Sequence, residues 1–180
     1  MRRRSQQSHR QARSSRTLTV GAVAVALLFG LVFLTRSRDS TIGAAAAPDI
    51  TLSYFDGSTE KLADLEGEPV VLNFWASWCP ACISEMPSFA EVHRRFGDAV
   101  RFVGINMQEV SLDAANDLVE RTGVEYQLAH DPDGAIFREF GGVAMPTTVF
   151  IAADGTVTRV HTGTIFSDDL TAIIEGDLLG

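Results

Sequence analysis

The sequence has very few cysteines and almost no lysine, and its charges are unevenly spread. Two cysteines among 180 residues exclude a scaffold of several disulfides and a zinc site built from several thiolates. Lys61 is the single lysine. Eight arginines and no acidic residue precede residue 39, so seven of the 15 basic residues and all 23 acidic ones lie in residues 39–180. An acidic main domain argues against a nucleic-acid partner, which requires a basic face.

Long uncharged runs are also scarce, with one near the N-terminus. Residues 17–34 (TLTVGAVAVALLFGLVFL) carry no charge and are about as long as the shortest bilayer-spanning helices. Six arginines precede this run, and positive charge stays on the cytoplasmic side. We therefore expect a cytoplasmic tail at residues 1–16 and a single-pass cell-membrane anchor at 17–34. A linker at 35–48 and an extracytoplasmic domain at 49–180 should follow.

A cleaved secretory signal is the alternative reading of this segment. The small residues at 44–47 (AAAA) offer a cleavage site, but they lie about ten residues beyond the apolar run. The length of the run and its arginine flanks favour a retained anchor. A buried core helix is disfavoured because the run has no polar face.

The rest of the chain alternates between strand and helix patterns. Continuous apolar runs at 70–76 and 101–107 predict strands buried on both faces. A helix is expected at 80–96, with Pro80 in its first turn and Pro87 kinking it. The other expected elements are a hairpin starting at 49–55, a helix at 111–122 capped by Ser111, a strand at 125–129, a helix at 135–140, a hairpin of 147–152 and 156–162, and a last helix capped by Ser167. The fold class is α/β, with a mixed sheet covered on both faces.

Cys79 and Cys82 form a CxxC motif between a buried strand and a helix start. Cys79 would lie at the helix N-terminus, where unpaired backbone N–H groups and the helix dipole favour a thiolate. Cys82, one turn later, would point inward. The pair would then supply an exposed attacking sulfur and a sheltered resolving sulfur, as two-step disulfide exchange requires.

Three plainer readings of the two cysteines remain. A structural disulfide closing so short a loop restricts the unfolded chain least. Metal binding needs further ligands, and His93, His130 and His161 lack metal-site spacing to the cysteines, so no metal site is expected. Two inert core cysteines would not need the strand–turn–helix setting. A CxxC in a βαβ-like context favours redox chemistry.

Several segments together resemble one family. Residues 75–82 (WASWCPAC) resemble the active-site segment of the thioredoxin-like superfamily, and 145–147 (MPT) resemble its cis-proline loop. Residues 82–87 (CISEMP) resemble the CxxExP of its membrane-anchored extracytoplasmic members, the ResA, TlpA and CcmG type. Residues 104–109 (GINMQE) resemble the start of that group's central insertion. The resemblance covers roughly residues 48–178. It implies a thioredoxin fold, with a central mixed sheet flanked by helices, after an N-terminal transmembrane helix.

The resemblance also implies roles for particular residues. Cys79 and Cys82 would react, Glu85 would handle protons beside them, and Pro146 would face the disulfide in a cis peptide bond. Cytosolic thioredoxins carry a buried aspartate where this chain has Asn73, so that role must move or vanish. The implied substrate contacts are Trp78, Pro80, Glu109, Met145 and Thr147. The plain alternatives are solvated glutamates at 85 and 109 and a strand-edge proline at 146.

The implied function is thiol–disulfide exchange that uses the Cys79–Cys82 pair and no other cofactor. The expected task is reduction of protein disulfides such as those of apocytochrome c, with electrons from a membrane thiol-reducing protein. The alternatives are a general extracytoplasmic reductase or oxidant, a thiol peroxidase of the redoxin type, and a copper chaperone. Pro80-Ala81 differs from the Gly-Pro of typical thioredoxins and the Pro-His of strong oxidants, so the sequence leaves the reduction potential open.

Overall fold

The structure, a computed structural model, describes residues 45–109 and 111–180. The expected tail, the expected anchor and most of the expected linker therefore lie outside the described residues. Within the described ranges, no helix is both long and apolar enough to cross a membrane.

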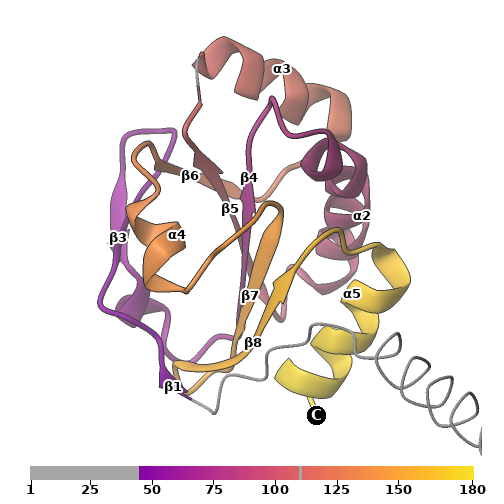
Figure 1. Cartoon of the computed structure of the whole chain (residues 1–180). Coiled ribbons are helices and arrows are strands. Elements are labelled where there is room, and N and C mark those ends of the chain that lie inside the picture. The colour runs from indigo at the N-terminus through magenta and orange to yellow at the C-terminus, as the bar shows by residue number, and fades with distance from the viewer. Residues whose placement is uncertain (1–44, 110) are drawn as a thin grey trace, which may run out of the picture. The chain divides into compact units, whose positions relative to one another are not determined.

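A mixed six-stranded sheet forms the centre of the domain, in the order β1-β8-β7-β4-β5-β6 (Figure 1). Strand β4 runs parallel to β5 and antiparallel to β7, and β5 runs parallel to β6. Strand β8 pairs antiparallel with β7 and with β1. The strands are β1 (Ala45–Ala46), β4 (Val70–Trp75), β5 (Arg101–Met107), β6 (Gln127–Asp131), β7 (Thr147–Ile151) and β8 (Thr156–Thr162). The predicted mixed α/β sheet is confirmed.

Helices cover both faces of the sheet. Figure 1 shows α2, α3 and α5 on one side and α4 with β3 on the other. The helical segments are η1 (Leu62–Leu65), α2 (Pro80–Phe96), α3 (Leu112–Thr122), α4 (Ala135–Glu139), α5 (Ser167–Ile173) and the π-helical turn η2 (Ile174–Leu178). A separate hairpin of β2 (Thr51–Ser53) and β3 (Thr59–Lys61) lies on the α4 side of the sheet. The buried Leu52 side chain belongs to the hydrophobic core between α4 and the sheet.

Strand β4 is buried along its whole length. Successive side chains of a strand point to opposite faces, so Val71 and Trp75 enter the core under α2 while Leu72 and Phe74 enter the core under α4. This two-sided burial explains the continuous apolar run at 70–76. It also makes the C-terminal end of β4 a rigid support for the turn that follows.

Some predicted details differ from the structure. The prediction that Ser167 caps the last helix is wrong, because Phe166 is the N-cap and Ser167 is the first helical residue. The Ser167 hydroxyl instead donates to Glu91 Oε2 at 2.7 Å, which ties α5 to α2. The strand expected at 125–129 starts two residues later, at the first residue that pairs with β5, Gln127. Strand β1 lies inside the segment expected to be a linker.

Candidate active site

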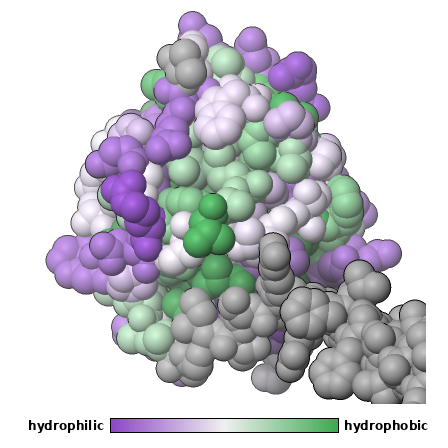
Figure 2. Space-filling view, in the orientation of Figure 1, coloured by the Kyte–Doolittle hydropathy of each residue, from purple (hydrophilic) through white to green (hydrophobic). Residues whose placement is uncertain are grey.

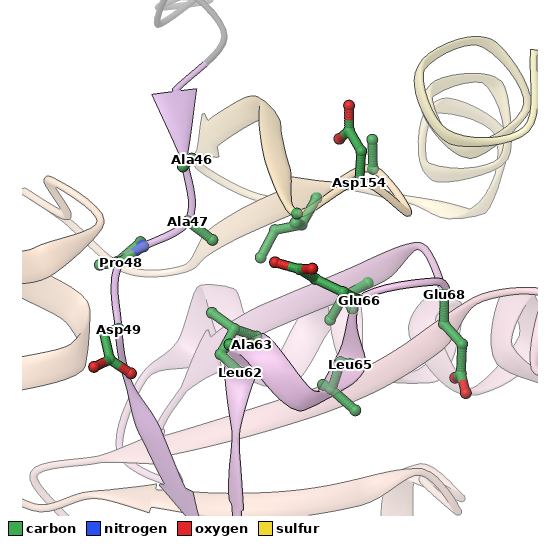
Figure 3. Close-up of a pocket in the computed structure, with 14 residues that line it drawn as sticks. Ala46, Ala47, Pro48, Asp49, Leu62, Ala63, Leu65, Glu66, Glu68 and Asp154 are labelled. Atoms are coloured by element: carbon green, nitrogen blue, oxygen red, sulfur yellow. The ribbon is translucent and has the colours of Figure 1, made fainter.

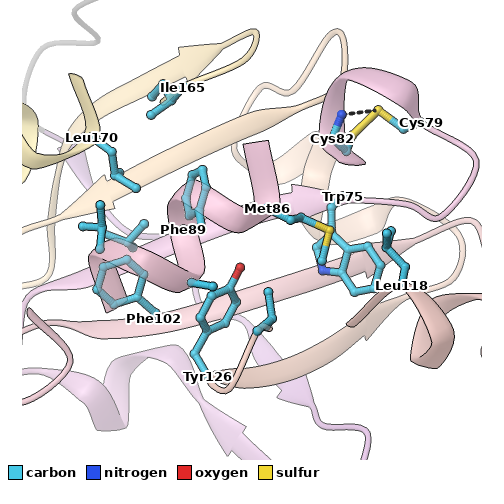
Figure 4. Packing of buried hydrophobic residues seen from close by; sticks show 14 of the residues in the cluster. Trp75, Cys79, Cys82, Met86, Phe89, Phe102, Leu118, Tyr126, Ile165 and Leu170 are labelled. Atoms are coloured by element: carbon cyan, nitrogen blue, oxygen red, sulfur yellow. Dashed lines mark hydrogen bonds between the residues drawn. A yellow bond between two sulfur atoms is a disulfide. The ribbon is translucent and has the colours of Figure 1, made fainter. Parts of the chain in front are cut away.

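Cys79 and Cys82 form a disulfide at the N-terminus of α2, with Cα atoms 5.3 Å apart. Cys79 is the helix N-cap and Pro80 takes the first helical position. The Cys82 backbone N–H donates to Cys79 Sγ at 3.2 Å (Figure 4). Backbone donors at a helix start favour negative charge, so the same contact stabilises a Cys79 thiolate once the bond is reduced.

The two sulfurs differ in their access to solvent. Cys79 is 6% exposed and Cys82 is fully buried. Trp78, immediately before the pair, is half-exposed, and its Nε1 donates to the Gln108 carbonyl at 3.1 Å. An incoming disulfide therefore has access to the Cys79 sulfur and not to the Cys82 sulfur.

Glu85 lies one helical turn beyond Cys82 and is fully buried. Its Oε1 accepts from Asn73 Nδ2 at 2.8 Å, and its Oε2 accepts from the Ile165 backbone N–H at 2.9 Å. Burial raises the pKa of Glu85 to about 7, although these two hydrogen bonds oppose the rise. A solvated Glu85 is therefore excluded. The carboxyl is placed to exchange a proton near neutral pH.

Asn73, in the middle of β4, holds this carboxyl. Its Nδ2 also lies 3.3 Å from Thr148 Oγ1 on the neighbouring strand β7. The buried acid near the disulfide thus comes from α2, and the strand contributes the amide that orients it.

The Met145–Pro146 peptide bond is cis, as the resemblance implies. Because β7 is antiparallel to β4 and Thr147 pairs with Phe74, Pro146 lies at the end of the sheet from which the disulfide turn departs. The Gly163 N–H donates to the Pro146 carbonyl at 2.9 Å. Thr147 is fully buried and its hydroxyl donates to the Ala144 carbonyl at 2.7 Å, so its side chain supports the loop from below.

Glu109 braces the turn between β4 and α2. Its Oε2 accepts from the Ser77 backbone N–H at 2.8 Å and its Oε1 from the Ser77 hydroxyl at 2.7 Å. Asn106, buried at the end of β5, also donates to Glu109 at 3.0 Å. The sequence analysis missed Ser77 and Asn106. Asn106 could have been noticed because it is a polar residue inside the apolar run 101–107.

Exposed apolar side chains occur in the segments next to the disulfide and the cis-proline loop. They are Trp78, Ile83, Val143 and Phe166. Figure 2 shows apolar residues gathered over the middle of one face, bordered by hydrophilic ones. The exposed Trp78 and Ile83, each adjacent in sequence to one of the two cysteines, offer apolar contacts to a partner at the disulfide.

A cavity of about 330 Å³ lies at the opposite end of the sheet. Ala47, Leu62, Val70 and Ile151 are part of its lining, and Figure 3 shows the Glu66 and Asp154 carboxylates at it. None of the described residues that line it is a cysteine or a histidine. Among residues 45–109 and 111–180, no cluster of histidine, cysteine and acidic side chains is able to hold a metal ion. The disulfide is therefore the reactive group that this part of the chain offers.

Fold and site together define a class, the thiol–disulfide oxidoreductases with a thioredoxin-like fold, in which a CxxC pair cycles between dithiol and disulfide. The chain belongs to the AhpC/TSA family, whose model matches residues 44–160.

Individual relatives agree with that assignment. The thiol-disulfide oxidoreductase ResA of Geobacillus thermodenitrificans is 31% identical over 144 residues, which cover 79% of this chain and 82% of ResA. The soluble secreted antigen MPT53 of Mycobacterium tuberculosis is 34% identical over 152 residues, covering 83% and 84%. The structure of a thiol:disulfide interchange protein of the thioredoxin family from Chlorobium tepidum matches with a TM-score of 0.67 at 29% identity, covering 76% and 97%. The predicted thioredoxin-like family and enzyme class are confirmed.

Proposed function

We propose that this oxidoreductase is a membrane-tethered, extracytoplasmic reductant of protein disulfides. One observation carries the disulfide-exchange chemistry of this proposal: the buried carboxyl of Glu85 lies one turn behind the buried Cys82 and has a pKa of about 7. A sheltered thiol needs a base to become a nucleophile, and an acid that titrates near ambient pH is suited to that task. The 31% identity to the thiol-disulfide oxidoreductase ResA supports disulfide exchange as the activity.

The reaction proceeds in two exchanges. The Cys79 thiolate attacks one sulfur of the substrate disulfide, and the other substrate sulfur leaves as a thiolate. The Cys82 thiol then gives its proton to the Glu85 carboxylate and attacks Cys79 Sγ. This step restores the Cys79–Cys82 disulfide and releases the second substrate thiolate. Two electrons pass from the cysteine pair to the substrate.

The substrate binds over the cis-proline loop. Backbone groups beside Pro146 pair with an extended substrate segment, while Trp78, Pro80 and Met145 contact its side chains. Trp78 is half-exposed next to Cys79, which supports this role. Glu109 and Thr147 act indirectly, since Glu109 holds Ser77 and Thr147 is buried beneath the loop.

The proposed substrate is apocytochrome c, whose haem-binding CxxCH cysteines must be reduced before haem attachment. A membrane thiol-reducing protein supplies the electrons. Residues 17–34 anchor the chain in the cell membrane, with the catalytic domain outside the cytoplasm. This assignment of substrate, donor and location rests on the resemblance to the membrane-anchored group and on the uncharged run.

A second candidate is a soluble or tethered oxidoreductase that acts on other exported proteins, including as an oxidant. The 34% identity to the soluble secreted antigen MPT53 supports it. The two candidates share the site chemistry. They differ in substrate and, where the second acts as an oxidant, in the direction of electron flow.

Cysteine variants of the full chain test the shared chemistry. The reduced protein is mixed with an oxidised CxxCH peptide, and free thiols and mixed disulfides are followed by mass spectrometry. We expect Cys82→Ser to accumulate the mixed disulfide, because the resolving sulfur is missing, and Cys79→Ala to form none. Reduction by Cys79→Ala at the wild-type rate would refute the mechanism.

A further inference from the structure

Three buried polar atoms near Glu85 have no hydrogen-bond partner among the described residues. They are Asn73 Oδ1, Trp75 Nε1 and the Tyr126 hydroxyl. A buried polar group without a partner is costly, and most such groups in native proteins bind a protein atom or an ordered water. One acceptor (Asn73 Oδ1), one donor (Trp75 Nε1) and one hydroxyl that can do either (Tyr126) therefore lack a partner among the described residues.

The sheet brings these atoms to the same face. Asn73 and Trp75 are two residues apart on β4, so their side chains point the same way. Gly104 on β5 pairs with Asn73, and because it has no Cβ, the side chains of Leu128, Trp75 and Tyr126 pack directly against it. Trp75 Nε1 and Tyr126 Cε2 lie 2.9 and 3.0 Å from the point where a Cβ of residue 104 would stand. Figure 4 shows the Tyr126 hydroxyl pointing from this place toward α2.

Glu85 lies on the α2 side of this cluster of side chains, where it accepts the hydrogen bond from Asn73. Burial raises the pKa of Tyr126 first, and the charge of Glu85 raises it further, so the two side chains are close enough to interact. Each Glu85 oxygen accepts one hydrogen bond, from Asn73 and from Ile165. A carboxylate oxygen can accept two, so each has capacity for another.

One water molecule matches the unpaired atoms in number and kind. Water accepts two hydrogen bonds and donates two, and buried waters typically make about three. It can accept from Trp75 Nε1 and from the Tyr126 hydroxyl, and it can donate to Asn73 Oδ1 and to Glu85. We propose that a buried water is bound by Tyr126, Trp75 and Asn73 and that it solvates the Glu85 carboxylate.

This inference deepens the proposed function, since it rests on Glu85 as the group that takes the Cys82 proton. A carboxylate sealed in an apolar core holds a charge poorly, and a bound water supplies the missing hydrogen bond. The groups that face Glu85 are Cys82 from α2, Tyr126 before β6, Asn73 and Thr148 from the sheet and the Ile165 backbone. Tyr126 is thus a positioning residue, which acts on Glu85 through the water.

The first test uses the unmodified full chain, oxidised and without substrate. Magnetisation transfer from water to the indole N–H groups is measured by NMR. The chain has two tryptophans, and Trp78→Phe assigns the remaining indole signal to Trp75. We expect a cross-peak from a long-lived water to the Trp75 N–H. The absence of such a water would overturn the proposal, whatever the variants do.

The second test compares Tyr126→Phe with Tyr54→Phe, since the chain has two tyrosines and Tyr54 donates to Glu60. The carboxyl titration of Glu85 is followed by carbon NMR in each oxidised protein. Loss of the Tyr126 hydroxyl should raise the Glu85 midpoint by about one pH unit and abolish the water signal, and Tyr54→Phe should do neither. A folded Tyr126→Phe with an unchanged midpoint contradicts the proposal. Neither measurement involves a substrate, so the outcome is separate from that of the peptide assay.

Discussion

At the scale of single residues, the surroundings of Glu85 make it the most unusual side chain in the domain. It is fully buried close to a redox-active pair, with a pKa raised by burial from 4.5 to about 7. An acid whose folded pKa lies above its unfolded value binds protons more tightly in the folded state. Its protonation therefore stabilises the fold at low pH, and that stability is lost as the pH rises through the folded pKa.

The direction of this pH dependence predicts how Glu85→Gln changes the stability of the oxidised protein. The wild type should lose stability between about pH 4.5 and 7, by up to roughly 3 kcal/mol. Glutamine cannot ionise, so the variant should lack this loss. Urea unfolding at pH 5 and pH 8 measures the difference, and Glu120→Gln, at an exposed position of α3, is the matched control. A variant with the same pH dependence as the wild type would show that Glu85 does not titrate in the fold.

We also expect Glu85→Gln to slow the resolving step of the exchange reaction. Without the carboxylate, the Cys82 thiol loses its proton acceptor, and the resolving step should slow by roughly 10²-fold. The attack by Cys79 should be little changed. Stopped-flow measurement of the two substrate thiols separates the steps, because the first thiol leaves on attack and the second on resolution. Equal slowing of both would instead indicate a distorted site.

At the scale of elements, the end of β5 holds the turn that follows β4. Glu109 accepts two hydrogen bonds from Ser77, and the Gln108 carbonyl accepts one from Trp78. The two residues before Cys79 are thus held by partners 30 and 32 positions away in sequence. The turn would otherwise be free to move Trp78 relative to the disulfide.

Ser77→Ala tests this brace, because it removes the hydroxyl bond and leaves the backbone bond. We expect a loss of stability of about 1 kcal/mol, the usual worth of one hydrogen bond to a protein, and a reduced rate of attack by Cys79. Ser84→Ala is the control, since Ser84 also donates a hydroxyl bond, within α2. Denaturant unfolding and the peptide assay give the two values. An effect no larger than that of Ser84→Ala would contradict the brace.

Local patterns predicted the elements that carry strong signals. Strand β4 and helix α2 followed from a continuous apolar run and from Pro80 at a helix start. Strand β1 is two alanines paired to β8, and such residues carry no strand pattern. Ser167 was expected to cap α5 because serine favours N-caps. Its hydroxyl instead donates to Glu91 on helix α2.

The sequence named the site residues of one helix and, through the resemblance, Pro146 and Glu109 from other segments, but it did not show which side chains hold them. Cys79, Cys82 and Glu85 follow from their spacing and from the family resemblance. The partners of Glu85 are 12 and 80 residues away in sequence, so only the sheet register and the packing of α5 reveal them. Tyr126 is likewise invisible to spacing, because its ring packs against Gly104 on the neighbouring strand β5.

At the scale of the whole domain, the two ends of the sheet differ. The disulfide turn leaves the end at Trp75, whereas β1 pairs with β8 at the end that contains Val70 and Ile151. The described chain therefore begins at the end away from the disulfide.

The reduction potential of the Cys79–Cys82 pair tests the central claim most directly. The full chain is equilibrated with glutathione or dithiothreitol buffers, and the reduced fraction is counted by thiol alkylation. A dedicated reductant should have a potential of about −250 mV or below, at the thioredoxin end of the scale. A value near about −120 mV, at the oxidant end, would contradict the account and assign the protein to disulfide formation in exported proteins.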